Sequence, residues 1–185
     1  MLPDFSNIDY LREGSAIQQK GWEILTSSGI LMALSPFKPI LTGTLPLDIF
    51  IENKSDLDIS CEVFHSPIFI HFAQDNLTKF NFSLKQKELR SIPSVIINFR
   101  LKDFEVEIVG QPLPIREQTA VRHLRIEYAL LQHGGESLKN QVLNLKAKGI
   151  KTEPAFASLL QLEGDPYEAL LKLEGNEHHR IKYIN

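Results

Sequence analysis

The hydrophobic and polar residues of the chain follow two periods, which together predict a mixed α/β fold. Between residues 56 and 63, Leu57, Ile59 and Cys61 alternate with polar residues, as in a strand with one buried face. Residues 15–28 place apolar side chains at helical spacing, and Gly29 is suited to end that helix. The pattern predicts further strands over residues 39–44, 80–89, 94–101 and 104–109, and helices over 30–34, 66–79, 116–132, 136–148 and after Glu153 and Asp165.

The order of these elements divides the chain into two parts. The strands between residues 80 and 109 are joined by turns too short for crossovers, so we expect them to pair antiparallel. After residue 114 only helices are predicted, with Gly134 and Gly135 separating the first two. We therefore predict a sheet-containing core over residues 1–113 and a helical C-terminal extension over 114–185 that packs on it. Its last residues, from 174 onward, are polar and are expected to dock loosely.

Composition and charge restrict the class of protein without choosing one. With 185 residues, 43% of them hydrophobic, the chain is long enough for one packed core. A formal net charge of -3 without long charged blocks gives no broad electrostatic case for binding nucleic acid or membranes. The single cysteine, Cys61, lies in an apolar series and is expected to be buried. Because no leader segment or long apolar run is recognised, a reducing cytoplasm is the expected location.

Two carboxylates stand at the start of the predicted strand over residues 56–63. Successive strand side chains point to opposite faces, so Asp56 and Asp58 share one side while Leu57 and Ile59 take the other. Two ionised acids held a few ångströms apart repel each other, and a hard divalent cation with oxygen ligands is the usual compensation. The pattern therefore predicts a Mg²⁺ site. Solvated acids at a strand entrance are the alternative interpretation.

Gly43 and Thr44 follow the preceding short strand and form a candidate phosphate-binding turn. Glycine lets the backbone approach an anion closely, and the next amide and hydroxyl can donate to it. A third acid comes from residues 104–109, where Glu105 and Glu107 share one face. Two metal ions, or one metal ion and a general base, require such an acid beside the aspartate pair. The alternative is a half-exposed edge strand with a wet acidic face.

Charged residues of the helix predicted over 116–132 are further candidates. Arg122 and Arg125 lie three residues apart and can face the same way, so either can neutralise a phosphate. His123 and Glu127, four residues apart, can pair with each other or bind metal. A solvated helix face is the competing interpretation for each of them.

Three segments resemble, in order and spacing, the nucleotidyltransferase fold shared by DNA polymerase beta, aminoglycoside and lincosamide nucleotidyltransferases and nucleotide-adding antitoxins. Those proteins combine a Gly-Gly or Gly-Ser turn, an acid-apolar-acid strand about ten residues later, and a third acid between apolar residues. The segments here are Leu41–Thr44, Asp56–Ile59 and Val106–Ile108. Thr44 departs from the common serine but keeps its hydroxyl. Nearly the whole chain is also similar to an uncharacterised bacterial family regarded as nucleotidyltransferase-like.

The resemblance implies a short mixed, twisted sheet with flanking helices and a helical C-terminal part. It also implies metal-assisted transfer of a nucleoside monophosphate from a nucleoside triphosphate to an unknown acceptor, with release of pyrophosphate. Asp56, Asp58 and Glu107 would be the catalytic residues and hold Mg²⁺ or Mn²⁺, with Glu107 preferred over Glu105 as the third acid. The residues implied to bind the nucleotide or its phosphates are Gly43, Thr44, Ser55 and Arg122.

Other functions are compatible with the same residues. The chain can be a nucleotide- or phosphate-binding module that keeps the fold without turnover, or a metal-dependent phosphohydrolase that uses water as the acceptor. A purely structural protein would not explain three aligned acids. The sequence does not choose the acceptor, the preferred base or the oligomeric state.

Overall fold

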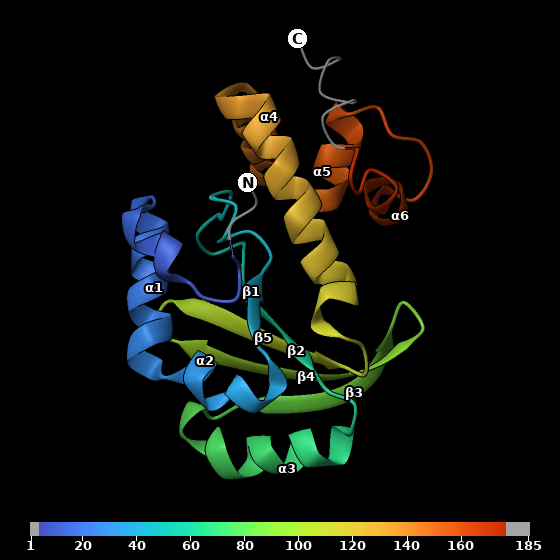
Figure 1. The fold of residues 1–185 in the computed structure, drawn as a ribbon. Coiled ribbons are helices and arrows are strands. Elements are labelled where there is room, and N and C mark those ends of the chain that lie inside the picture. Colours follow the sequence, from blue (N-terminus) through green and yellow to red (C-terminus); the bar gives the residue numbers. More distant parts are fainter. Residues whose placement is uncertain (1–3, 177–185) are drawn as a thin grey trace.

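A five-stranded sheet forms the centre of the protein in the computed structural model, which describes residues 4–176 (Figure 1). The strand order is β1-β2-β5-β4-β3. β2 and β5 run parallel and the other neighbouring pairs run antiparallel, so the sheet is mixed. The strands are β1 (Ile40–Thr42), β2 (Leu57–Glu62), β3 (Ser83–Leu89), β4 (Ile92–Leu101) and β5 (Phe104–Gln111).

The helices flank this sheet, and their ends follow local sequence signals. α1 begins after Ser15, which forms a capping box with Gln18, and it ends at Gly29 in the left-handed conformation. α6 begins after Asp165, whose carboxylate accepts a hydrogen bond from the Glu168 amide. The α-helices are α1 (Ala16–Ser28), α2 (Ile30–Ala33), α3 (Ser66–Asn76), α4 (Thr119–Ala147), α5 (Thr152–Leu159) and α6 (Pro166–Leu171).

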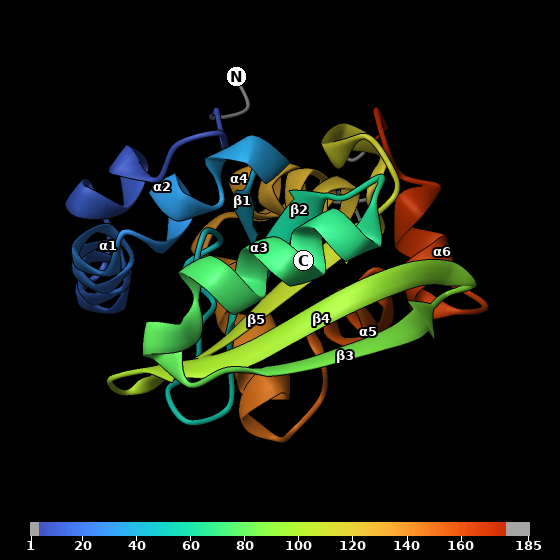
Figure 2. The same ribbon diagram turned by 90° about the horizontal axis from the view of Figure 1, so that it is seen from below.

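One face of the sheet is apolar and is covered by α1, α2 and α3. Leu57, Ile59 and Cys61 of β2 are buried on this side in one cluster with Leu25 of α1 and Phe69 of α3. Figures 1 and 2 show α3 lying across the strands on this face. Because side chains alternate along a strand, the residues between these three must point to the other face.

The other face of β2 and β5 is polar and lies toward the C-terminal helices. Asp58 and Ser60 alternate with the buried apolar residues of β2, and Glu107 lies beside Asp58 on β5. Above this face α4, α5 and α6 form a second apolar cluster that includes Leu124 and Phe156 (Figure 1). The sheet and the C-terminal helices thus have separate apolar cores, with polar residues between them.

The predicted fold class is confirmed, and the differences concern the ends of elements. The break predicted between the helices over 116–132 and 136–148 is confirmed: α4 consists of two helical segments that meet in a kink at Gly135, whose φ of 59° and ψ of -159° favour glycine. β3 begins at Ser83 rather than at residue 80, because Asn81 adopts a left-handed φ of 50° after a 3-10 turn. The kink in α4 and the later start of β3 each arise from a single residue with positive φ.

Two further expectations concern the chain as a whole. The division at residue 113 stays a prediction, and part of the tail expected to dock loosely, residues 177–185, lies outside the described residues. Over residues 4–176, no helix combines the length and the apolar character needed to span a membrane.

Candidate active site

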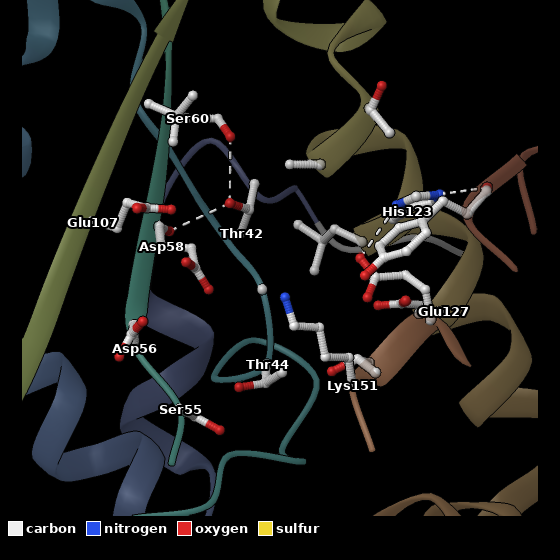
Figure 3. A pocket seen from close by; sticks show the side chains of 18 of the residues that line it. Thr42, Thr44, Ser55, Asp56, Asp58, Ser60, Glu107, His123, Glu127 and Lys151 are labelled. Carbon is white, nitrogen blue, oxygen red and sulfur yellow. Dashed lines mark hydrogen bonds and ion pairs between the residues drawn. The ribbon is translucent and has the colours of Figure 1, made fainter. Parts of the chain in front are cut away.

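A cavity of about 790 Å³ lies between the polar face of the sheet and the C-terminal helices. The end of β1, the strands β2 and β5, the hairpin between β3 and β4, and helices α4 to α6 all contribute to its lining. Figure 3 shows carboxylates on the strand side and His123 and Glu127 on the helix side. The candidate residues from the sequence that line it are Gly43, Thr44, Ser55, Asp56, Asp58, Glu107, His123 and Glu127.

The parallel pairing of β2 and β5 brings the three predicted acids together. Asp58 and Glu107 are paired residues of these strands, and Asp56 precedes Asp58 by two positions. Burial, followed by the charges of Glu107 and Asp56, raises the pKa of Asp58 to about 8. Burial also raises the pKa of Asp56, with Glu107 and Glu105 as the neighbouring charges. The strands therefore concentrate negative charge at one wall of the cavity.

Glu107 and Glu105 differ in their surroundings although they share a face of β5. Glu107 is half-buried at the cavity and accepts a hydrogen bond of 3.2 Å from the Asn98 amide. Glu105 is exposed and pairs with Arg100 at 3.0 Å. Only Glu107 lines the cavity. This placement agrees with the choice of Glu107 as the third acid, a role that stays a prediction.

Gly43 allows the turn after β1 to touch the acid pair. Its φ is +69°, and a Cβ atom at this position would lie 2.0 Å from an Asp58 carboxylate oxygen. Any other residue would therefore combine backbone strain with a collision against Asp58. The glycine is required here for the close approach of backbone and carboxylate.

Thr44 and Ser55 lie on the same side of the cavity and differ in their bonding. The buried Thr44 hydroxyl has no hydrogen-bond partner among the described residues, which leaves it free to bind a ligand. The Ser55 hydroxyl accepts a hydrogen bond of 3.1 Å from the Ile51 amide and thereby closes the loop before β2. Ser55 thus has a structural role in addition to its predicted one.

Two arginines of α4 lie apart from the predicted acids. Arg122 is absent from the cavity lining and binds a carboxylate oxygen of Glu174 at 2.7 and 3.0 Å. Arg125 is exposed. The role predicted for Arg122 in binding phosphate stays a prediction, although its guanidinium already has a carboxylate partner.

Lys146 and Lys151, which the sequence did not single out, are two of the lysines that line the cavity. Figure 3 shows Lys151 reaching from the start of α5 into the space between the strand and helix sides. Lys146 is buried and donates to the Thr152 hydroxyl at 2.9 Å. Burial lowers its pKa, while Glu127, Glu153 and Asp58 oppose that shift. No local motif marks these lysines, because only the fold brings the start of α5 over residues about a hundred positions earlier.

The helix side of the cavity contains a second group of titratable residues. His123 connects α4 to α5 and α6: one ring nitrogen lies 3.5 Å from Glu153 and the other 2.9 Å from the Tyr167 carbonyl oxygen. Burial alone would raise the pKa of Glu153, but the hydrogen bond and charge of His123 hold that pKa below its usual value. Glu127 is buried beside them, and desolvation raises its pKa well above the usual value.

The donor atoms of the strand side fit a hard divalent cation. Three carboxylates lie on one wall of the cavity, where burial and the charges of Glu107 and Asp56 raise the pKa of Asp58, and a cation bound there would offset this repulsion. Within residues 4–176, no group of three or more His, Cys, Asp or Glu side chains is arranged so that it could hold a metal ion by itself. Magnesium commonly takes only one or two carboxylates and keeps waters or substrate phosphates as its other ligands. Two of the three acids Asp56, Asp58 and Glu107 would therefore be enough to hold such an ion.

Comparison with known structures defines the class of fold. The Cid1 poly(U) polymerase with Mg 3'-dATP bound matches with a TM-score of 0.55 and 15% identity, over 88% of this chain and 52% of that one. Terminal uridylyl transferase 4 from Trypanosoma brucei with bound dUTP matches with a TM-score of 0.52 and 11% identity, over 90% of this chain and 62% of that one. The GLD-2/RNP-8 complex matches with a TM-score of 0.52 and 17% identity, over 82% and 57%.

The fold is therefore that of the nucleotidyltransferases, as the sequence motifs predicted. The chain itself belongs to the family described as Domain of unknown function (DUF4269), whose model matches residues 23–173. No curated protein matches it. The chain spans between about half and two thirds of the length of the three structures above. The similarity to an uncharacterised bacterial nucleotidyltransferase-like family stays a prediction.

Proposed function

We propose that the protein is a metal-dependent nucleotidyltransferase that moves a nucleoside monophosphate from a nucleoside triphosphate to an acceptor hydroxyl or phosphate. One observation carries the proposal: on a nucleotidyltransferase fold, Asp56, Asp58 and Glu107 line one cavity beside the Gly43 turn. Such transfer depends mainly on positioning and on neutralising phosphate charge, and it needs no covalent intermediate with the protein.

Each residue then has a defined part in the reaction. The Gly43 backbone and the unpaired Thr44 hydroxyl bind phosphate oxygens, and Lys151 neutralises their charge from the opposite side. Asp56 and Asp58 hold Mg²⁺ or Mn²⁺, which supplies charge neutralisation at the polyphosphate when it is bound. Glu107 either shares in holding metal or accepts the proton of the attacking hydroxyl.

The bonds that form and break are those of an in-line substitution at phosphorus. The acceptor oxygen attacks the α-phosphorus, the bond from that phosphorus to the bridging oxygen breaks, and pyrophosphate leaves with the electron pair. Where Glu107 acts as the base, a hydroxyl acceptor gives its proton to Glu107, while an ionised acceptor phosphate has no proton to transfer. The half-buried Glu107 carboxylate, fixed by Asn98, is positioned on the same wall as the aspartates.

The experiment compares the wild type with Asp58→Asn and with the matched control Asp75→Asn, an exposed acid of α3 outside the cavity. Each protein is incubated with ATP, GTP, CTP or UTP, Mg²⁺ or Mn²⁺ and a cell extract, and pyrophosphate and intact masses are measured. We expect metal-dependent pyrophosphate release in the wild type and in Asp75→Asn, and none in Asp58→Asn. Asp58→Asn should also lose the stabilisation against heat that Mg²⁺ gives the wild type.

Other outcomes would assign the protein to the competing functions. Nucleotide binding that requires Mg²⁺ but never releases pyrophosphate would indicate a binding module. Release of orthophosphate without an acceptor would indicate a phosphohydrolase. Full activity of Asp58→Asn at saturating Mg²⁺ would show that the metal assignment is wrong.

A further inference from the structure

Glu127 is a buried acid on the helix side of the cavity that the proposed reaction does not use. Its side chain is only 4% exposed, and it lines the cavity from α4. Its Oε1 atom has no hydrogen-bond partner in the described part of the chain. Buried carboxylates normally have partners, because an unpaired one costs folding free energy. A buried carboxyl with an unpaired oxygen beside a cavity is therefore a candidate for binding a ligand.

The neighbours of Glu127 have other hydrogen-bond partners. The Lys146 ammonium donates to the Thr152 hydroxyl at 2.9 Å. The two ring nitrogens of His123 lie against Glu153 at 3.5 Å and the Tyr167 carbonyl oxygen at 2.9 Å. These contacts fix the wall around Glu127 without satisfying its Oε1 atom. The Oε1 atom of Glu127 therefore keeps unused hydrogen-bonding capacity in the wall of the cavity.

Glu127 also lies on the side of the cavity away from the acids. Figure 3 shows Asp58 and Glu107 on the strand side, Glu127 and His123 on the helix side, and Lys151 between them. A triphosphate held near Gly43 and Lys151 leaves the nucleoside as the part that can reach the helix side. Sugar hydroxyls are common to all four ribonucleotides, whereas N–H donors differ from base to base.

We propose that Glu127 is a specificity-determining residue that accepts a hydrogen bond from an N–H group of the nucleobase. This inference rests on the proposed function, because it requires a nucleotide in the cavity. A base that offers an N–H at this place satisfies the carboxyl, whereas a base without one leaves a buried acceptor unpaired. Sites built in this way discriminate strongly against ligands that lack the donor.

The experiment measures binding by calorimetry in the presence of Mg²⁺, with tripolyphosphate, ATP, GTP, CTP and UTP as separate ligands. Tripolyphosphate has no sugar or base, so its affinity measures the contribution of the phosphate- and metal-binding residues alone. The variants are Glu127→Leu, which removes the acceptor, and Glu127→Gln, which keeps one acceptor and adds a fixed donor. Glu136→Gln, an exposed change in the same helix, is the matched control, and thermal unfolding checks that each variant folds.

We expect the wild type to prefer at least one nucleotide and to bind it more tightly than tripolyphosphate. Glu127→Leu should lower the affinity for the preferred nucleotide by about tenfold or more, which is the usual contribution of a hydrogen bond to a carboxyl. The affinity for tripolyphosphate should not change. Glu127→Gln should change the order of preference among the four bases. Glu136→Gln should behave as the wild type does.

Three results would overturn the inference. Equal affinities of the wild type for all four nucleotides would exclude base selection by Glu127. If Glu127→Leu lost the same factor in affinity for all four nucleotides, Glu127 would contact the sugar or have a structural role. Unchanged binding in both variants would show that Glu127 does not touch the nucleotide. Absence of binding by tripolyphosphate and by every nucleotide would instead overturn the proposed function, and the inference with it.

Discussion

At the scale of single residues, the cavity is built from groups that are unfavourable for the folded protein alone. Asp58 has a pKa raised to about 8 by burial and by Glu107 and Asp56. Thr44 and Glu127 each bury an oxygen atom without a partner in the part of the chain described here. Proteins commonly keep such unfavourable groups where a ligand needs them, at a cost in stability.

The contact between Gly43 and Asp58 can be tested by a pair of glycine substitutions. Gly43 and Gly29 have the same φ of +69°, but a Cβ on Gly29 meets nothing within 4 Å. Gly43→Ala should therefore lower the free energy of unfolding by about 1–3 kcal/mol more than Gly29→Ala does, because it also collides with Asp58. Urea unfolding of both variants measures the difference. Equal losses would show that the Asp58 contact imposes no constraint.

The buried Glu127 should make stability depend on pH. Burial raises its pKa well above the ordinary value of 4.5, so the folded protein keeps a proton that the unfolded chain releases. The stability that comes from this proton is complete below about pH 4.5 and is lost as the pH rises through the folded-state pKa. Glu127→Gln should thus gain stability relative to the wild type as the pH rises. Urea unfolding between about pH 4 and about pH 8 tests this, with Glu136→Gln as a control that should show no such gain.

At the scale of elements, the parallel pairing of β2 with β5 makes the acid wall. β2 and β5 lie about fifty residues apart in the sequence, yet Asp58 and Glu107 are paired residues. A shift of one residue in this pairing would move Glu107 away from Asp58 and turn its side chain to the apolar face. The Asn98 amide of the neighbouring strand β4 holds Glu107 at 3.2 Å.

This register predicts which glutamate of β5 matters for turnover. Glu107→Gln should reduce pyrophosphate release at least tenfold more than Glu105→Gln, because only Glu107 lines the cavity and can receive a proton there. Glu105 is exposed and paired with Arg100, so its replacement should change little. Steady-state rates of the two variants at saturating Mg²⁺ measure the ranking. The reverse ranking would move the third acid to Glu105.

At the scale of the whole molecule, two apolar clusters enclose a polar cavity. Contacts between residues 1–113 and residues 114–185 join the two parts of the chain. Leu47 and Ile49 from the N-terminal part lie in the same cluster as Leu124 and Phe156. At the rims of the cavity, Lys54 donates to the Ala147 carbonyl at 2.8 Å, and Arg90 pairs with Glu168 at 3.3 Å. We propose that residues 1–113 and 114–185 are two parts of one cooperative unit.

Cooperative unfolding tests this proposal. The only tryptophan, Trp22, lies in α1 and reports on the sheet-side core, whereas far-ultraviolet circular dichroism is dominated by helices that include the long α4. Because apolar contacts join the two parts, both signals should change in one transition. Leu124→Ala should lower the free energy of unfolding by about 2–5 kcal/mol and move the midpoints of both signals together. Two separate transitions would indicate independent domains.

The sequence alone determined the order and type of the main helices and strands, though not all of their ends, and the carboxylate motif. Alternation in β2, the helix-ending glycine Gly29 and the acids Asp56, Asp58 and Glu107 are all local signals, and such signals follow from backbone and side-chain geometry over a few residues. The fold class followed from the same motifs.

Only the tertiary structure decided how distant segments combine. The parallel register of β2 and β5, the entry of Lys151 into the cavity and the unpaired Oε1 atom of Glu127 depend on contacts between residues far apart in the chain. The structure also placed Arg122 against Glu174 instead of in the cavity lining. Residue types show which groups can bind a ligand, but burial, charge and remaining hydrogen-bond capacity are set by packing of the whole chain.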